Sequence, residues 1–506
     1  MPLVPIQLPA GLERNNTPYE TLDHYWDSNL VRWQSGSIVP VGGWTRLTAT
    51  PLADAVRKIH VYRDNSDQRH TLVGTDSKLY EDNGSSYTDI TPAAFVPLNT
   101  PGTGGYGTLT YGSSTWGTPR SGSSGVFSPY SYWTMDNWGQ DVILTANSDG
   151  RIFYYSTATA TVAPAVVTTA PTGNNGVAVT PERHVIAFGQ VGSSGSVFRV
   201  AWCSREDYTD WNFASTTNTA GFQDLDAHSP LIAAPQVREG HLIFSRSDVY
   251  LMQYVGQPFI FGFTWLAATA MMHPASIIPF NGRAAWLSRS GFQLYNGGVV
   301  SDLPCPILND IFAEMDPTYG QFRIHGALNG KFPELWWFYP TRGNTEANRY
   351  VMWNYDENWF AWGMLTRSAM SSAVTDVAPF MGSADGNIYQ HDAADQWTNA
   401  GNPRFQDIFI ETGALGVSDR IVDINQLQAA TGDGATALKV TAFAQYTPEG
   451  AVNTFGPYTP RSDGYCDTRI SGRNVRFRWQ PTADGSWGIG TVRVDIPQAQ
   501  GTGAKR

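Results

Sequence analysis

The chain is poor in charge for its 506 residues, and no part of it is strongly basic. Charged residues make up 15% of the sequence, well below the usual quarter. Its 33 Lys and Arg face 44 Asp and Glu, which gives a formal net charge of −11. The only adjacent basic pairs are Arg57-Lys58 and Lys505-Arg506. Because tight binding of nucleic acid needs clustered Lys and Arg, this composition argues against a protein that grips DNA or RNA.

Cysteines and long apolar runs are scarce as well. Cys203, Cys305 and Cys466 lie far apart, form no CxxC motif and cannot all pair. This pattern fits a chain that folds in a reducing cytosol, although one disulfide is still possible. No stretch of 18 apolar residues occurs, and the start of the chain lacks a charged segment followed by an apolar one. We therefore expect a soluble protein without a signal peptide or a membrane anchor.

Aromatic residues, glycine and proline are abundant. Aromatics make up 13% of the sequence, including 18 Trp, and there are 50 Gly and 31 Pro. Such a composition is typical of a β protein with short strands and many turns. The surplus of aromatics fits either the filling of several β-sheet cores or large buried interfaces between subunits.

A repeat runs from Thr71 to Asp392 and predicts the fold. Each copy has an apolar strand, a turn of small residues and a second strand that ends in an aromatic residue. Five copies contain the anchoring tyrosines Tyr80, Tyr154, Tyr250, Tyr295 and Tyr389. Two looser copies fill the wide gaps, with strands at Val185–Gly189 and Val197–Trp202, and at Leu335–Tyr339 and Arg349–Trp353. A period in the forties with several short strands predicts an all-β chain with a β-propeller of seven blades, or six if a terminal unit belongs elsewhere.

The sequence divides into three regions around this repeat. Residues 1–50 contain five prolines and are expected to form an extended N-terminal arm. Residues 51–400 hold the propeller, with a Gly/Ser/Thr-rich insertion at 100–125 and one helix at 304–316. Residues 401–506 alternate apolar and polar residues, which predicts an antiparallel C-terminal β domain of the sandwich type.

Candidate motifs for chemistry are weak, so we predict no catalytic, cofactor-binding or metal-binding residues. Gly102–Gly107 has the letters of GxGxxG, but Gly and Thr continue on both sides and no helix can follow. The nine histidines show no HExxH motif, and Asp64–Asp67 lacks the glutamate and the glycine of a calcium loop. The remaining motifs read as structural turns, strand histidines and surface carboxylates, namely Ser148–Gly150, Ser383–Gly386, His60, His70, His184, His241, Asp207, Asp210, Asp356 and Glu357.

Short aromatic and glycine motifs recur along nearly the whole chain and carry a resemblance. They are Asn29–Trp33 with Gly42–Trp44, Trp133–Gly139, Tyr254–Phe259, Leu303–Phe312, Asn348–Tyr355 with Asn358–Trp362, Asn387–His391, Ile410–Gly413, Gly456–Tyr458 and Arg469–Arg476. In these the chain resembles the propeller-containing tail nozzle, or packaged-DNA stabilisation, proteins of short-tailed bacteriophages.

The resemblance implies a structural virion protein of the phage tail, made in the cytoplasm of a bacterial host. Its subunits would form a homo-oligomeric ring, usually a hexamer, below the portal and adaptor rings, with tail fibres as further partners. The ring would line the last segment of the DNA channel, retain the genome and conduct it at infection. An acidic protein suits a channel that double-stranded DNA must pass without sticking.

Two other functions remain open from the sequence. A propeller can bind glycans of a receptor through exposed aromatic platforms, for which Trp116, Trp211 and Trp362 are candidates. A propeller glycosidase would need two carboxylates that face each other across a sugar. Within the nozzle interpretation, the insertion 100–125 is either a channel gate or a contact to fibres or a neighbouring subunit, or a disordered insertion. The C-terminal domain and the N-terminal arm are expected to contact the ring above.

Overall fold

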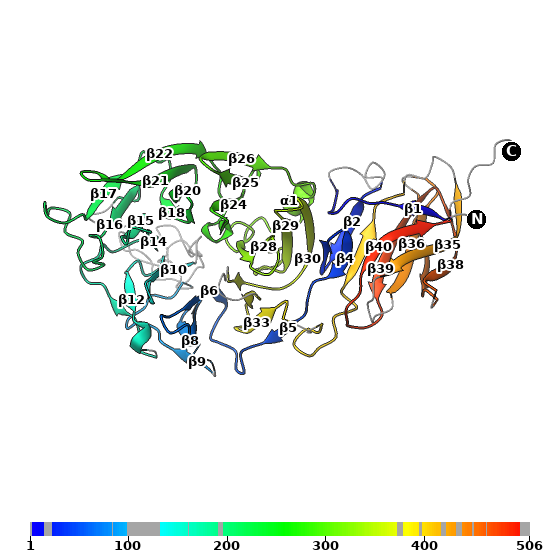
Figure 1. Ribbon diagram of the computed structural model, residues 1–506, viewed down its shortest axis with the longest axis horizontal. Helices are drawn as coiled ribbons and strands as arrows, with labels where there is room; N and C mark the ends of the chain where they lie inside the picture. Colours follow the sequence, from blue (N-terminus) through cyan, green and yellow to red (C-terminus); the bar gives the residue numbers. More distant parts are fainter. Residues whose placement is uncertain are drawn as a thin grey trace, which may run out of the picture.

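The computed structural model shows two β domains side by side along one axis, a ring of sheets and a two-sheet domain (Figure 1). The residues that the structure describes are 3–14, 23–82, 84, 86–98, 132–159, 161–190, 196–371, 378–393, 397–415, 421–431, 438–447, 450–461 and 463–495. None of the helices in these ranges is long and apolar enough to cross a membrane. The insertion 100–125, including Gly102–Gly107 and Trp116, lies outside the described residues.

Within the described ranges, seven antiparallel sheets surround a common centre and form a seven-bladed β-propeller (Figure 1). The first blade consists of β6 (Val56–Arg63), β7 (Arg69–Thr75), β8 (Leu79–Asp82) and β9 (Tyr87–Asp89). The second consists of β10 (Trp133–Trp138), β11 (Asp141–Ala146), β12 (Phe153–Tyr155) and β13 (Ala165–Val166). The third consists of β14 (Gly176–Val179), β15 (Val185–Phe188), β16 (Arg199–Trp202) and β17 (Gly221–Asp224).

The next three blades follow in chain order. They are β18 (Leu231–Ala233), β20 (Gly240–Ser245), β21 (Asp248–Gly256) and β22 (Ile260–Ala268), with β19 (Gln236–Val237) beside β20; β23 (Ile278–Phe280), β24 (Arg283–Ser288), β25 (Gly291–Asn296) and β26 (Val299–Leu303); and β27 (His325–Asn329), β28 (Glu334–Tyr339), β29 (Arg349–Asn354) and β30 (Trp359–Met364). Short 3₁₀ turns lie at η1 (Thr157–Thr159) and η2 (Pro274–Ser276).

The anchoring tyrosines mark the same place in every blade that carries one. Each lies on the third strand from the centre, on β8, β12, β21, β25 or β33 (Ile388–His391). In the two looser copies, Trp202 on β16 and Trp353 on β29 take the equivalent strand. The predicted all-β propeller fold is therefore confirmed, and the blade number is seven.

The seventh blade is completed by a strand from near the start of the chain. Its strands are β31 (Ala369–Met370), β32 (Phe380–Gly382), β33 and, at the outer edge, β5 (Trp44–Arg46). Tyr389 of β33 pairs with Arg46, and His391 pairs with Trp44. The ring is thus closed by hydrogen bonds between the two ends of the repeat region, which leaves the first and last blades no freedom to separate.

The second domain consists of two sheets that both chain ends build together. One sheet has the order β3 (Val31–Gln34), β4 (Ser37–Pro40), β40 (Ile489–Val494), β35 (Val422–Thr431) and β38 (Tyr465–Gly472), with β1 (Val4–Ile6) paired to β40. The other has the order β2 (Tyr25–Asn29), β34 (Phe409–Thr412), β39 (Asn474–Pro481), β36 (Leu438–Gln445) and β37 (Asn453–Tyr458). Strands β36, β38 and β39 alternate buried and less buried residues, as expected for sheets with one face in a core.

The N-terminal region departs from the expected extended arm. Strands β1 to β4 belong to the two sheets of the C-terminal domain, and β5 belongs to the propeller. Apolar residues explain the difference, because Leu30, Val31, Trp33 and Ile38 are all buried in the core. The described prolines of this region, Pro5, Pro9 and Pro40, fall in strands or their connections and do not prevent β pairing. The domain boundaries at 50 and 400 therefore have to include β5 in the propeller and β1 to β4 in the sandwich.

The predicted helix is present as α1 (Leu308–Glu314), which follows the fifth blade. The buried residues Ile307, Ile311 and Met315 lie on one side of it, as their spacing predicts. Arg14 of the N-terminal segment donates to Asp310 on the helix at 2.9 Å. The helix therefore packs between the propeller and the N-terminal segment.

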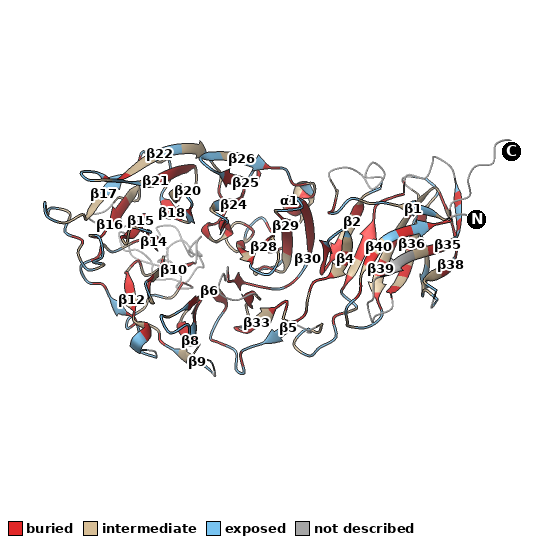
Figure 2. Ribbon diagram, in the orientation of Figure 1, coloured by how far each residue is buried: buried red, intermediate tan, exposed pale blue. Residues whose placement is uncertain are grey.

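The two domains share one continuous joint along the sixth blade. β2 lies on β30, where Ser28 Oγ donates to the carbonyl of Trp362 and the amide of Met364 donates to Asn29 Oδ1. The Trp362 indole donates to Asp27 at 2.8 Å. Figure 2 shows this region as mostly buried, and one apolar cluster runs from the fifth and sixth blades into the sandwich.

A buried charge cluster lies at the centre of this joint. Arg32 of β3 donates to both oxygens of Asp392, at 3.0 and 2.9 Å, and to Glu334 of β28 at 3.1 Å. All three side chains are at most 3% exposed. Asn329 and the Trp336 indole add hydrogen bonds to the two carboxylates. The cluster thus connects the sandwich with the sixth and seventh blades.

Removing the positive charge from this cluster should be costly. In Arg32→Met two buried carboxylates lose their counter-charge, and we expect the free energy of unfolding to fall by about 3–5 kcal/mol. The measurement is urea unfolding followed by tryptophan fluorescence. Arg63→Met is the matched control, because Arg63 forms an exposed pair with Asp67 and such pairs contribute little. Equal stability of the two variants would contradict a structural role for Arg32.

Candidate functional site

The first strand of every blade lines a cavity of about 320 Å³ at the centre of the propeller. Side chains of β6, β10, β14, β18, β23, β27 and β31 all reach it. At about 30 Å³ for each water molecule, this space holds on the order of ten waters. The walls are largely apolar, and the titratable side chains among the described lining residues include Arg57, Lys58, Asp136 and His325.

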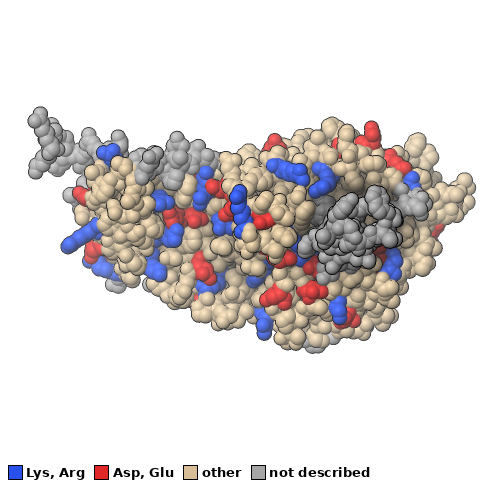
Figure 3. All heavy atoms as spheres, turned by 180° about the vertical axis from the view of Figure 1, so that it is seen from behind, with Lys and Arg blue, Asp and Glu red and all other residues tan. Residues whose placement is uncertain are grey.

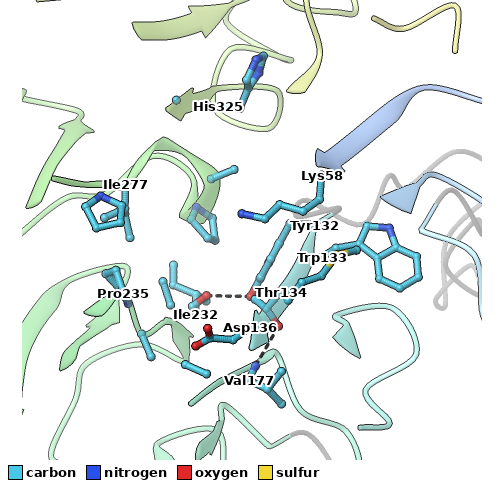
Figure 4. Close-up of a pocket in the computed structure, with 18 of the residues that line it drawn as sticks. Lys58, Tyr132, Trp133, Thr134, Asp136, Val177, Ile232, Pro235, Ile277 and His325 are labelled. Carbon is cyan, nitrogen blue, oxygen red and sulfur yellow. Dashed lines mark hydrogen bonds between the residues drawn. The ribbon is translucent and has the colours of Figure 1, made fainter. Parts of the chain in front are cut away.

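Lys58 points into the cavity from β6, and Asp136 faces it from β10 (Figure 4). Asp136 accepts hydrogen bonds from the backbone amides of Val179 and Asn137, at 2.8 and 2.9 Å. Among the described residues, no hydrogen bond or ion pair reaches the Lys58 ammonium. Burial lowers the pKa of Lys58, which the charge of Asp136 partly offsets, and burial raises the pKa of Asp136.

The charge of Arg57, the residue before Lys58, is matched by two carboxylates. It donates to both oxygens of Asp76 at 2.8 Å and to both oxygens of Glu346 at 2.7 Å. Glu346 also lies 3.6 Å from Arg323. This network joins the first blade to the loop between β28 and β29 across the seventh blade. Arg57 therefore links parts of the propeller through its ion pairs. Lys58 is a cation in the cavity that has no ion-pair partner among the described residues.

Two carboxylates facing each other are needed for glycoside hydrolysis, and the described lining of the cavity contains one. The four carboxylates that the sequence offers lie elsewhere. Asp207 and Asp210 accept backbone amides two residues further along their own loop. Asp356 and Glu357 are exposed, and Glu357 accepts from the Trp359 indole. Their positions agree with turn and surface roles.

The turn motifs also form local structure. Asp149 of Ser148–Gly150 accepts from Arg151, and Asp385 of Ser383–Gly386 accepts from the amide of Asn387. Both Gly150 and Gly386 have positive φ angles and lie against neighbouring backbone. Asp64 accepts from the amides of Ser66 and Gln68, which closes a hairpin.

The strand histidines are packed and hydrogen-bonded. His60 contacts Asn137 at 2.8 Å, and His70 lies between Asp64 and Glu81. His184 and His241 contact the backbone carbonyls of Cys203 and Ala234. Across the described ranges, no group of three or more His, Cys, Asp or Glu is placed to hold a metal ion.

Two further candidates from the sequence are buried. Trp211 and Trp362 are 6% and 3% exposed, so neither can serve as an open platform for a sugar ring. Cys203, Cys305 and Cys466 are free and buried, so the disulfide that the sequence left possible does not form.

Sequence reasoning missed Lys58 and Asp136 as facing groups. The only signal for Lys58 is its place among the β-branched and aromatic residues of Val56–Tyr62, and for Asp136 its place between two tryptophans. Neither pattern says that the two strands belong to adjacent blades. That information lies in the order of blades around the ring.

No known protein family and no curated protein matches the chain. Among solved structures it is similar to YCF48 bound to D1 peptide, with 8% identity, a TM-score of 0.39 and coverage of 71% of this chain and 98% of that one. It is also similar to the Pan2 WD40 domain of Neurospora crassa (9%, 0.41, 72% and 99%). A third is inactive virginiamycin B lyase from Staphylococcus aureus with quinupristin (9%, 0.39, 69% and 98%). These similarities say nothing about function.

Replacing Lys58 should not weaken the fold. Lys58→Met removes a desolvated charge and keeps the length of the side chain, so we expect unchanged stability or a gain of up to about 1 kcal/mol. Thermal unfolding measures the change. Arg57→Met is the neighbouring control and should destabilise the fold, because it leaves Asp76 and Glu346 without the guanidinium that they pair with. A large loss of stability in Lys58→Met would show that an unseen partner holds the ammonium.

Acid should destabilise the propeller through its buried histidines. Burial lowers the pKa of His60 to about 4 and those of His273 and His325 to about 3. The unfolded chain therefore binds protons from about pH 6.5 downward while the folded chain does not, and stability falls as pH falls through that window. Each histidine contributes up to about 1.4 kcal/mol per pH unit.

Thermal unfolding between pH 7 and pH 5 tests this expectation with His325→Gln as the variant. His325 stacks on Phe338 at 4.9 Å, and its Nε2 atom has no hydrogen-bond partner among the described residues. We expect a shallower loss of stability with acid in His325→Gln than in the unmodified chain. Parallel pH profiles would contradict the role of this histidine.

Proposed function

We propose that the chain is a structural subunit of a phage tail nozzle, one copy of a ring that ends the DNA channel of a short-tailed phage. The ring, a hexamer by resemblance, retains the packaged genome below an adaptor or portal-proximal ring and conducts it at infection. Tail fibres are further candidate partners. The chain then acts through its shape and its contacts.

The observation that carries the proposal is where the resembling motifs lie. Asn29–Trp33 contains Arg32 and forms the turn from β2 to β3. Asn358–Trp362 enters β30, and Ile410–Gly413 includes β34, the strand beside β2. These three motifs therefore lie at the buried joint between propeller and sandwich, while others, such as Trp133–Gly139 on β10 and Tyr254–Phe259 at the tip of β21 and β22, lie elsewhere in the propeller. The resemblance supports a shared two-domain body, in which a rigid angle between domains is what a ring subunit needs.

The narrow centre of the propeller supports a channel between copies. A cavity that holds on the order of ten waters cannot pass a DNA duplex, so DNA would run along an outer surface of each subunit. On the face shown in Figure 3, acidic and basic side chains are interspersed, without a continuous basic surface. With a net charge of −11, such a surface lets DNA slide past without strong attraction.

The two alternatives have less support. A receptor-binding propeller needs exposed aromatic platforms. The candidates Trp211 and Trp362 are buried, and among the described tryptophans Trp265, at 54% exposure, is the one open to stack on a sugar. A glycosidase needs a facing carboxylate pair, which the described lining of the central cavity lacks.

Imaging of particles tests the proposal. We expect electron microscopy of virions with an affinity-tagged copy of this chain to place the tag in a ring at the tip of a short tail. Particles that lack the chain should package DNA and then lose it, which nuclease protection of the genome measures. Restoring the chain should restore protection.

Two results would reject the proposal. One is absence of the tagged chain from purified virions, and the other is full DNA retention by particles that lack it. Cleavage of a host saccharide by the purified chain would instead favour the glycosidase. Glycan binding by the free chain would favour the receptor-binding module.

A further inference from the structure

The outer strand of the fourth blade is unlike the other outer strands of the propeller. β22 has nine residues, ends its sheet and lies on the outer rim of the ring (Figure 1). It belongs to a stretch from Val249 to Gly282 that contains no Asp, Glu, Lys or Arg. A long, uncharged edge strand offers unpaired main-chain donors and acceptors, which soluble proteins normally protect.

The other outer strands in the described ranges show that protection. β13 has two residues, and β5 carries Arg46. β9 and β17 each end in an aspartate, which pairs with Lys78 or Arg199. β26 carries Asp302. In the sandwich, the edge strand β37 contains Pro457, which removes a donor.

The sixth blade shows what this fold does with an uncharged outer strand. β30 has the sequence Trp-Phe-Ala-Trp-Gly-Met, and five of its six residues are buried. The sandwich covers it, with hydrogen bonds from Ser28 to a β30 carbonyl and from a β30 amide to Asn29. The chain thus protects β30 by covering it, because charge and proline are absent.

β22 lacks such a cover. No described strand pairs with its outer edge, and Thr264 and Trp265 on it are exposed, Trp265 to 54% although its indole donates to Asp248 at 3.4 Å. The pairing of β20 with β21 ends at His241 and Met252. From there β21 and β22 continue, paired only with each other, as a two-stranded ribbon. At its tip Val255 is 57% and Phe259 75% exposed. The edge and the tip together form an apolar surface.

The ribbon packs against the third blade of the propeller. Phe261 of β22 packs edge-on against the Trp202 and His184 rings of the third blade, with centroids 5.2 Å apart in each case. The exposed apolar side chains are therefore presented on a fixed support, which lowers the entropy cost of docking.

Charge limits where two copies of this chain can meet. Each copy carries a net charge of −11, so two copies repel each other wherever charged surfaces meet. An uncharged rim removes that repulsion and leaves apolar area and free main-chain groups for contact. We propose that the β22 edge and its ribbon tip form the contact between neighbouring copies of this chain. The inference rests on the proposed ring and names one of its contact surfaces.

A ring of more than two copies requires a heterologous contact. In a closed ring each subunit offers one surface to one neighbour and a different surface to the other, whereas two β22 edges on a twofold axis would stop at a pair. β22 of one copy would therefore meet a different element of the next copy, and strand pairing would add main-chain hydrogen bonds to the apolar contact.

Light scattering coupled to size exclusion, on a dilution series of the purified full-length chain, tests the contact. The variants are Thr264→Glu, which buries a charge in the contact, and Trp265→Ser, which removes the exposed indole. Val162→Glu is the matched control, because Val162 is 58% exposed and lies on the second blade. Thermal unfolding checks that every variant is folded.

We expect the unmodified chain and Val162→Glu to assemble alike, and each β22 variant to weaken assembly at least tenfold in dissociation constant. Assembly of both β22 variants at the unmodified strength would overturn the inference. So would a chain that stays monomeric at every concentration, or one that assembles only when an adaptor protein or a glycan is added.

The same variants on virions separate this inference from the proposed function. If the chain is a nozzle subunit but β22 is no contact, Thr264→Glu virions keep a complete ring and retain DNA. If the chain is no nozzle subunit, the unmodified chain is itself absent from the tail tip. The first result rejects the contact alone, and the second rejects the proposed function whether or not the free chain assembles.

Discussion

The burial of Arg32 is the constraint on which the arrangement of the two domains depends. An arginine at 2% exposure is tolerated only with its charge fully met, and the partners come from two different blades. Burial raises the pKa of Glu334, whereas Arg32 and the hydrogen bonds from Gly42 and Asn329 outweigh burial and lower the pKa of Asp392. The pair Arg32–Asp392 is thus the ionic core. A shift of the sandwich against the propeller would leave these charges unpaired in an apolar interior.

This constraint explains why the N-terminal segment is shared between domains. β3 brings Arg32 into the joint, Gly42 donates its amide to Asp392, and β5 then closes the seventh blade. A single stretch of chain therefore completes the sandwich, neutralises the joint and closes the ring. Ring closure and docking of the two domains are therefore coupled, because both depend on the position of this one segment.

The parts of the fold that could be predicted from the sequence are those with local signals. The tyrosine repeat placed the third strand in five blades, and the apolar spacing of 304–316 found α1, because both patterns are set by neighbours along the chain. The N-terminal strands were missed because their sheet partners lie hundreds of residues away: β1 and Ile38 of β4 pair with β40, and β2 pairs with β34. The same reason hid Lys58 and Asp136, whose proximity depends on the order of blades.

Low charge has two consequences that belong together. A chain with 15% charged residues has few side chains with which to protect edge strands, and it protects β30, which carries no charge, by covering it within one subunit. The fourth blade lies far from the sandwich along the ring and cannot be covered in that way (Figure 1). An uncharged edge strand such as β22 is open to pairing with other chains unless something covers it. Under the contact proposed above, neighbouring copies of the chain supply that cover.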